Sequence, residues 1–255
     1  MIRELAENPN VHQRLSSSQR LICDPDGRYA IFLNTGSGPH SATVQRVRLE
    51  AEQVAGAVAE IRSILRENGR TGAEWELGDS CTPTDLVEQL AGFGIHPDPD
   101  EPLAIGMVLR DPGTVNPPPG ATARRVETVE ELMLAQNIQG RAFGQEETAD
   151  DQTASQVFQL EGVNGSTFLA FVDGVPAGAA YAAYTPLGLL LFGGATLHEM
   201  RGRGAYRALV AARAREAIKQ GTPLLVTHAG KMSRPILDRI GFVPVSTIVR
   251  LLDVF

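Results

Sequence analysis

One stretch, residues 196–209, constrains the fold more than any other part of the chain; it reads Thr-Leu-His-Glu-Met-Arg-Gly-Arg-Gly-Ala-Tyr-Arg-Ala-Leu. It follows a short apolar run, Leu187–Phe192, that is typical of a buried strand. Apolar residues then recur at a spacing of three to four, as on one face of a helix, up to a stop signal at Gly221. These apolar positions are Tyr206, Leu209, Val210, Ala214, Ala217 and Ile218. The sequence therefore predicts a strand, a tight loop and a helix.

The loop between this strand and this helix has residue types that suit an anion. The first turn of a helix exposes unpaired backbone N–H groups and the positive end of the helix dipole. Gly202 and Gly204 leave the backbone open and permit unusual dihedral angles. Arg201 and Arg203 can donate charge-assisted hydrogen bonds to phosphate oxygens. A plain glycine-rich turn with solvated arginines is the alternative, and the flanking strand and helix favour the anion site.

Known phosphate-binding motifs narrow the choice of ligand. The Gly-Lys-Ser/Thr of a P-loop is absent, and the third glycine of the Rossmann fingerprint is not met. The segment instead resembles the signature of the GNAT family, the GCN5-related N-acetyltransferases, which is Gln/Arg-x-x-Gly-x-Gly/Ala. It matches at Arg201 and Gly204 and departs at Tyr206, where a small residue is usual.

A second resemblance to the GNAT family follows at the family's spacing. Residues 223–227 are a strand candidate, and residues 232–240 are a short helix candidate with Ser233 able to cap its start. Gly241-Phe242 and a last strand over 243–252 complete the pattern. The two motifs together cover roughly the C-terminal half of the chain.

The resemblance implies a cofactor and a reaction. The cofactor would be acetyl-CoA, with its pyrophosphate on the loop, and an amine of a small molecule or peptide would attack the thioester directly. A bulky residue at Gly204 should then abolish cofactor binding and leave the fold intact. The implied cofactor-binding residues are Thr196, Leu197, Arg201, Gly202, Arg203, Gly204, Ala205, Tyr206 and Ser233.

The catalytic residues are less evident. Many GNAT members donate a proton from a tyrosine four residues before the Gly-Phe pair, and that position here is Leu237. His228, at the expected end of a strand, is the catalytic candidate because an imidazole exchanges protons near neutral pH. A polar strand-end residue without a catalytic role is the alternative for His228. An acidic run could attract a cationic acceptor or form a solvated loop: Glu146, Glu147, Asp150 and Asp151.

A proline-rich segment, Asp111–Gly120, predicts a division of the chain into two parts. We expect a first domain over 1–112, a linker over 113–120 and an acetyltransferase domain over 121–255. In the first domain, strands are expected over 29–33 and 44–49. A helix over 51–68, a strand over 73–77, a short helix over 84–91, Gly92-Phe93 and a strand over 102–109 follow.

This order of elements repeats faintly after residue 205, which predicts an internal repeat. The first domain is then a degenerate GNAT-like copy without the cofactor motif, or else an unrelated α+β domain. The expected fold class is α+β, with a mixed, mostly antiparallel central sheet flanked by helices, the GNAT fold, and two such units in tandem.

Composition excludes several partners. A net charge of −7 and a pI of about 5.3 argue against general attraction to nucleic acid or to an anionic membrane. The two cysteines are too few for a disulfide framework and have no metal-type spacing, so we expect no metal ligand. The charged first residues and the lack of a long apolar run predict a cytoplasmic protein. The resemblance is compatible with a homodimer, since GNAT members often pair.

Three functions follow from these patterns. The first is an acyl-CoA-dependent N-acyltransferase. The second is a non-catalytic module that binds or senses acyl-CoA, motivated by Leu237 and by the degenerate first domain. The third is an enzyme that uses the same loop for a nucleotide phosphate.

Overall fold

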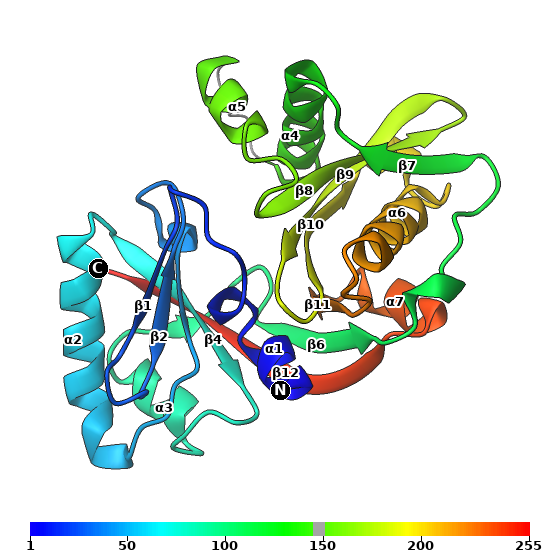
Figure 1. Ribbon diagram of the computed structural model, residues 1–255. Helices are drawn as coiled ribbons and strands as arrows, with labels where there is room; N and C mark the ends of the chain where they lie inside the picture. The colour runs from blue at the N-terminus through cyan, green and yellow to red at the C-terminus, as the bar shows by residue number, and fades with distance from the viewer. Residues whose placement is uncertain (145–150) are drawn as a thin grey trace. The chain divides into compact units, whose positions relative to one another are not determined.

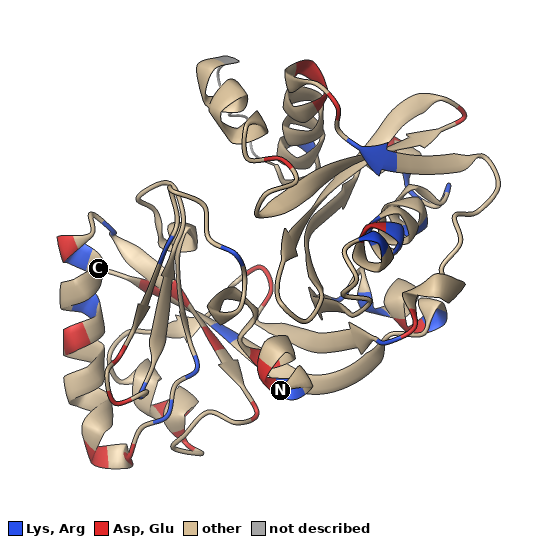
Figure 2. Cartoon of the chain, viewed as in Figure 1, with Lys and Arg blue, Asp and Glu red and all other residues tan. Residues whose placement is uncertain are grey.

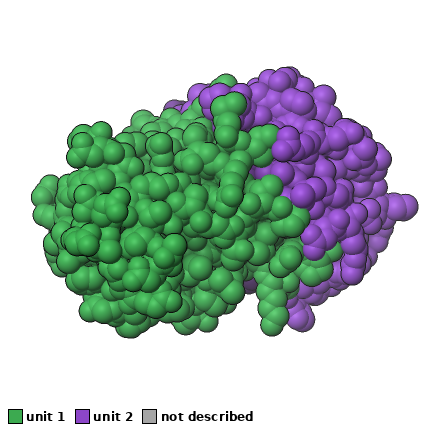
Figure 3. Space-filling view, turned by 90° about the horizontal axis from the view of Figure 1, so that it is seen from below, with its two compact units in different colours: residues 1–107, 228–235, 244–255 green, residues 108–227, 236–243 purple. Residues whose placement is uncertain are grey.

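Contacts divide the chain into two units in the computed structural model, which describes residues 1–144 and 151–255 (Figure 1). The first unit comprises residues 1–107, 228–235 and 244–255, and the second comprises residues 108–227 and 236–243 (Figure 3). The chain therefore returns to the first unit after completing most of the second.

The first unit is an open sheet with one long helix on one of its faces. In sheet order its strands are β1 (Arg20–Cys23), β2 (Ala30–Leu33), β3 (Ala42–Gln45), β4 (Gly72–Gly78), β12 (Val243–Val254) and β6 (Leu103–Leu109), with the short β5 (His96–Pro97) paired to β12. Its helices are α1 (Ile2–Glu7), α2 (Val54–Glu67) and α3 (Leu86–Ala91).

Helix α2 covers this sheet because its apolar residues lie on one stripe. Val54, Val58, Ile61 and Leu65 are buried with Trp75 of β4 in one hydrophobic cluster. The opposite face of β4 is polar, because strand residues alternate between faces and Glu74 and Glu76 flank the buried Trp75. One strand thus separates an apolar core from a pair of carboxylates.

Strand β12, the last of the chain, belongs to the first unit. It pairs antiparallel with β4, from Ile248 opposite Gly78 to Val254 opposite Gly72. Its Asp253 is fully buried and forms an ion pair of 2.7 Å with Arg62 of α2. The contacts therefore divide the chain elsewhere than at the expected boundaries 112 and 121. Whether residues 1–112 and 121–255 are two copies of one domain stays a prediction.

The second unit is a mostly antiparallel sheet between helices. In sheet order its strands are β11 (Leu225–Ala229), β10 (Leu189–Thr196), β9 (Val175–Tyr184), β8 (Gly165–Val172) and β7 (Ala121–Arg125). Its helices are α4 (Val129–Phe143), α5 (Asp151–Phe158), α6 (Ala205–Lys219) and α7 (Arg234–Ile240), the last of which starts in the first unit. Only β10 and β11 run parallel among these strands.

Helices α4 and α6 cover opposite faces of the second sheet. Neighbouring residues of β9 show this, because Ala179 packs in the cluster of α4 whereas Gly178 lies against Leu209 of α6. Helix α4 starts at Thr128, whose hydroxyl accepts the N–H of Glu131. Residues of α4 and residues of α6 therefore reach this sheet from opposite faces.

The mixed α+β fold with a mostly antiparallel sheet is confirmed. Helix α1 and strands β1 and β5 of the first unit were not expected. The hairpin turn forms at Asp173 and Gly174, which both have a positive φ, as an Asp-Gly turn requires. The expected end of the strand over 44–49 was wrong. Strand β3 stops at Gln45, because the next residue, Arg46, takes a φ of 57°. The proline-rich linker is more ordered than expected, with a 3-10 turn at Pro112–Thr114.

None of the helices in residues 1–144 and 151–255 is long and apolar enough to cross a bilayer.

The Arg62–Asp253 pair generates a stability prediction. Asp253→Ala should lower the free energy of unfolding by about 2–4 kcal/mol, because it leaves a largely buried guanidinium without its carboxylate. Urea denaturation followed by circular dichroism measures this change. Glu60→Ala is the matched control, since Glu60 pairs with Arg28 at the surface of the same helix and should contribute about 0–1 kcal/mol. Equal effects of the two substitutions would contradict the anchoring role of Asp253.

Candidate functional site

A bulge interrupts β10 in the second unit. Phe192 lies opposite Tyr181 of β9, but Ala195 lies opposite Ala179, so β10 carries one extra residue at Gly193-Gly194. Gly193 has a φ of 56°, which favours glycine. A bulge re-aims the backbone groups of a strand, and here it lies just before the glycine loop.

Two side chains hold this bulge from opposite faces of the sheet. Gln139 of α4 donates its Nε2 hydrogen to the carbonyl oxygen of Gly193 at 2.8 Å. Tyr206 of α6 lies against Gly194, where an added Cβ would approach its ring to 2.8 Å. An added Cβ at Gly193 would come within 2.6 Å of Gln139. Gly193 is therefore favoured by its backbone conformation, and Gly194 is favoured by its packing against Tyr206.

Buried polar atoms without a partner lie on both of these helix-covered faces. Gln136, one turn before Gln139, has a buried Oε1 that accepts no hydrogen bond from the described residues. Thr196, at the end of β10, has a buried Oγ1 that is likewise unpartnered within the described part of the chain. Such groups cost free energy unless a ligand or water satisfies them.

Strands β10 and β11 pair only at their start. Leu189 lies opposite Leu225 and Leu190 lies opposite Val226, and the hydroxyl of Thr227 donates to the carbonyl oxygen of Leu191. Strand β10 continues to Thr196, beyond its last residue paired with β11. The bulge therefore falls in the part of β10 that has no β11 partner.

The glycine loop leads from β10 into α6. Gly204 is the N-cap residue, with a φ of 92° and no capping side chain, and Gly202 has a φ of 77°. Among the described residues, none accepts a hydrogen bond from the backbone N–H of Gly202, Arg203, Gly204 or Ala205. The loop is exposed over residues 201–203. It therefore offers a row of free donors at the positive end of a helix.

The two arginines of the loop differ in their contacts. Arg203 forms an exposed ion pair of 2.7 Å with Asp173 in the β8–β9 turn. Arg201 is exposed, and its side chain has no hydrogen bond or ion pair to the rest of the described chain, although its backbone N–H donates to the carbonyl oxygen of His198. Basic side chains continue along α6, which Figure 2 shows in blue. Arg201 is thus the loop cation that is available to a ligand.

A further cation lies inside α6. Arg213 is buried, donating from Nε to the carbonyl oxygen of Leu209 and from Nη1 to that of Tyr181. Its Nη2 has no acceptor within residues 1–144 and 151–255. Burial lowers the pKa of Arg213 to about 10, so it stays charged at neutral pH. No carboxylate of the described residues neutralises it, which adds positive potential to the helix that carries the loop.

Comparison with known proteins identifies the fold to which this arrangement belongs. No protein-family model matches the chain, and no curated protein matches it in sequence. Solved structures do match. A GCN5-related N-acetyltransferase from Kribbella flavida is 24% identical, with a TM-score of 0.69 over 99% of this chain and 95% of its own. The chain has the GNAT fold.

Other solved structures agree. A tandem GNAT protein from the clavulanic acid biosynthesis pathway is 17% identical, with a TM-score of 0.61 over 98% of this chain and 86% of its own. A GCN5-related N-acetyltransferase from Sphaerobacter thermophilus is 14% identical, with a TM-score of 0.60 over 94% and 81%. The resemblance noted in the glycine loop is therefore confirmed at the level of the fold.

Within this GNAT fold, the second unit offers poor proton donors. Leu237, at the position of the usual tyrosine, is fully buried. Burial, together with Glu161 and Tyr184, raises the pKa of Tyr181 to about 12. Tyr184 is buried and hydrogen-bonds to Glu216 and Ser166. These tyrosines therefore belong to the packing of the sheet.

Most of the expected cofactor residues, those from Thr196 to Tyr206, lie in one continuous segment of the second unit. This segment runs from the end of β10 to the first turn of α6. Leu197 already donates its N–H to the carbonyl oxygen of Ala177, so that group is engaged within the protein. Ser233 and His228 belong to the first unit. The Ser233 hydroxyl donates to the carbonyl oxygen of Gly230 at 3.4 Å. The cofactor contacts themselves stay predictions.

Gly204 requires a correction. An added Cβ there would overlap the Cγ of Pro118 from the linker, and the residue has a φ of 92°. A bulky residue at Gly204 would therefore disturb the packing of the linker on α6, so the expectation of an intact fold was wrong. Gly202 has no atom within 4 Å of an added Cβ, and Arg201 projects freely. The arginine is the cleaner probe of the loop.

His228 is held by the first unit from two sides. Its Nε2 lies 2.9 Å from the carbonyl oxygen of Ala6, and its Nδ1 lies 3.4 Å from Oε1 of Glu76. The His228 side chain is only 6% exposed. Both ring nitrogens therefore face an oxygen acceptor of the first unit. A catalytic role for His228 stays a prediction, and it requires one of these contacts to open.

Glu76 is the centre of this buried network. Burial raises the pKa of its carboxyl, but His228, Arg250 and Gln45 outweigh burial and hold the pKa at about 2. Arg250 lies opposite Glu76 in the β4–β12 pairing and also binds Glu101 at 2.6 Å. Acidic segments of β4 and a basic segment of β12 lie side by side in Figure 2.

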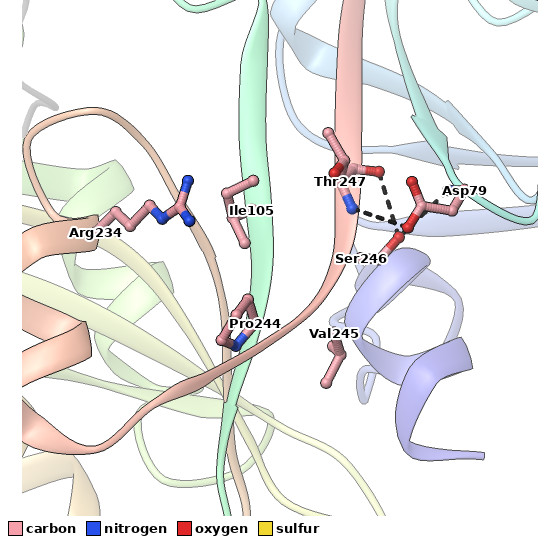
Figure 4. Close-up of a pocket in the computed structure, with 7 residues that line it drawn as sticks. All are labelled: Asp79, Ile105, Arg234, Pro244, Val245, Ser246 and Thr247. Carbon is pink, nitrogen blue, oxygen red and sulfur yellow. Dashed lines mark hydrogen bonds between the residues drawn. The ribbon is translucent and has the colours of Figure 1, made fainter.

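An open pocket of about 290 Å³ lies in the first unit, beside β6 and β12 (Figure 4). Arg234 and Ile105 line one part of it, and Asp79 lines another, where its carboxylate accepts the N–H of Thr247. Its volume is at the lower limit for ligand pockets. The loop and bulge of the second unit are therefore the stronger candidate site.

Sequence reasoning missed three residues of this site: Gln136, Gln139 and Arg213. Each is a polar residue on a helix stripe that is otherwise buried and apolar, which is the signal that could have revealed them. The acidic residues Glu146, Glu147 and Asp150 lie outside the described residues, and the side chain of Asp151 is not described either.

The Glu76 network generates a prediction on pH. The pKa of Glu76 is lower in the folded chain than its ordinary value of 4.5, so the carboxylate stabilises the fold above pH 4.5 and loses this effect as pH falls towards 2. Glu76→Gln should lower the free energy of unfolding by about 3–5 kcal/mol near neutral pH, because it removes the carboxylate that pairs with the largely buried Arg250.

Urea denaturation over a pH series measures this difference between wild type and variant, which should shrink below pH 4.5. Glu101→Gln is the control, since Glu101 binds the same arginine but is 44% exposed. A difference that stays constant down to pH 2 would disprove the ionised state of Glu76.

Proposed function

We propose that the second unit binds acetyl-CoA and transfers its acetyl group to an amine of a small molecule or peptide. The observation that carries this proposal is the row of backbone N–H groups from Gly202 to Ala205 that have no acceptor among the described residues, beside an exposed Arg201 whose side chain has no partner among those residues either. Donors of this kind at a helix start suit a pyrophosphate.

Two further features of the second unit fit acetyl-CoA. The part of β10 from the bulge to Thr196 has no β11 partner, so its backbone can accept a ligand as a strand would. The buried, unpartnered Oγ1 of Thr196 lies at the end of the same segment. Bound acetyl-CoA would supply an activated thioester.

The protein's own residues then have positioning roles. Gln139 fixes the carbonyl oxygen of Gly193 and so sets the direction of the bulge. Gln136, one turn away, offers an unpartnered carbonyl oxygen that can accept a hydrogen from an acceptor amine. Holding two reactants in the correct geometry accounts for a large part of an enzyme's rate enhancement. The similar solved structures named as N-acetyltransferases support this assignment.

A non-catalytic acyl-CoA-binding module is the second candidate. The buried Leu237 favours it, since no side chain at that position can supply a proton. The raised pKa of Tyr181, about 12, favours it as well. The two candidates share the loop and differ only in turnover.

Turnover decides between the two candidates. We expect the full chain to release free thiol from acetyl-CoA in the presence of at least one member of a panel of amines and peptides. Mass spectrometry of the mixture should show a product heavier by one acetyl group. Saturable acetyl-CoA binding without product from any acceptor would instead support the binding module, and the absence of binding would overturn both.

The loop generates a prediction on affinity. Arg201→Ala should weaken acetyl-CoA binding roughly 10- to 100-fold, because a charge-assisted hydrogen bond to phosphate contributes about 1.5–3 kcal/mol. Isothermal titration calorimetry measures the affinity. The same variant should bind acetyl-pantetheine, which lacks the pyrophosphate, as the wild type does.

Lys219→Ala is the control, because Lys219 is also a cation of α6 but lies in the last turn of the helix. It should leave both affinities unchanged. If Arg201→Ala weakened both ligands equally, the arginine would act on the fold of the loop, and the pyrophosphate assignment would be refuted.

A further inference from the structure

Three side chains that can bind a metal ion converge in the first unit. His40 lies in the 3-10 turn Pro39–Ser41, Glu74 lies on β4, and Asp98 follows β5. One ligand atom from each lies within 4.8 Å of the other two. The Nδ1 of His40 and the Oε1 of Glu74 are 2.6 Å apart. The cluster therefore unites an imidazole with two carboxylates from three separate segments.

The two carboxylates of this cluster are short of hydrogen-bond donors. Asp98 is 7% exposed, and its Oδ1 accepts the N–H groups of Asp100 and Glu101 at 2.8 and 3.1 Å. Its Oδ2 has no donor among the described residues. Glu74 has His40 as its hydrogen-bond partner. Two carboxylates thus lie close together with few donors, which a cation would relieve.

We propose that His40, Glu74 and Asp98 bind one divalent transition-metal ion, with Zn²⁺ as the ion that fits best. Zn²⁺ accepts imidazole nitrogen and carboxylate oxygen at about 2.0–2.2 Å and keeps water at an open position when three protein ligands are present. Calcium and magnesium prefer sites made of oxygen ligands alone. The imidazole of His40 therefore selects against both of them.

The cluster can adjust to the ion. Ligand atoms around one tetrahedral Zn²⁺ lie about 3.4 Å apart, so the 2.6 Å contact of His40 with Glu74 has to open by less than about 1 Å. The His40 side chain is 66% exposed and free to make this shift. Asp98 is fixed by its two backbone donors and serves as the rigid ligand.

Bound metal would tie together parts of the first unit that are distant in sequence. His40 precedes β3, Glu74 pairs with Thr43 of β3, and Asp98 donates its N–H to the carbonyl oxygen of Arg250 in β12. A bound ion would therefore connect the segments at β3, β4 and β12. It would also stabilise the folded unit by mass action. This site is independent of the acetyl transfer proposed above.

Equilibrium dialysis and calorimetry with Zn²⁺ test the proposal on the full chain after treatment with a chelator. We expect one equivalent of Zn²⁺ to bind, with a rise in the melting temperature. Co²⁺ in its place should give visible absorption from a site with nitrogen and oxygen ligands. His40→Ala should weaken the Zn²⁺ affinity at least roughly tenfold and remove the rise in melting temperature.

His96→Ala is the matched control, because His96 is an exposed histidine two residues before Asp98 that is not part of the cluster. It should bind Zn²⁺ as the wild type does. His40 is exposed, so its variant folds, and the melting curves without metal verify this. Absence of saturable binding would overturn the proposal. So would an affinity unchanged by His40→Ala, or one lowered equally by His96→Ala.

Discussion

The pairing of β12 with β4 is the constraint on which the first unit depends. It places Arg250 opposite Glu76 and brings Asp253 to Arg62 of α2, so the last strand of the chain supplies charges to both faces of the sheet. On one face the Arg62–Asp253 ion pair anchors α2. On the other face Arg250 pairs with the buried carboxylate of Glu76. Neither arrangement exists until residues near 250 have joined residues near 75, so the first unit is complete only after β12 has paired with β4. Contacts of such large sequence separation form late and slowly.

The site of the second unit depends on backbone conformation more than on reactive side chains. Gly193 and Gly204 both have positive φ angles, and each lies against another residue that leaves no room for a side chain. The bulge and the loop therefore present main-chain groups at fixed positions, held by Gln139 and Pro118. Such a site can keep its ligand while the surrounding side chains change, which is consistent with a tyrosine at position 206 and a leucine at position 237.

Local features of this chain were predictable and distant ones were not. The stripe of α2, the cap at Thr128 and the Asp-Gly turn each follow from residues within a few positions of one another. The glycine loop was recognised for the same reason. The partners of His228 lie 152 and 222 positions away, and no local pattern encodes them. Likewise, Gln139 reaches Gly193 across 54 positions, so the clamp on the bulge was visible only in the fold. Strand β3 ended early because Arg46 adopts a left-handed conformation, which no propensity of arginine suggests.

The groups that a ligand could contact differ in charge between the two units. In the second unit the glycine loop has donors and a cation without partners among the described residues, namely the loop N–H groups and the Arg201 side chain. In the first unit the His40 cluster has two carboxylates, Glu74 and Asp98. A basic loop at a helix start attracts an anion, whereas an imidazole beside two carboxylates attracts a cation. Two copies of one fold would diverge in this way if one had kept the anionic cofactor and the other had lost the glycine loop. The polar face of β4 would then be free to bind a metal ion.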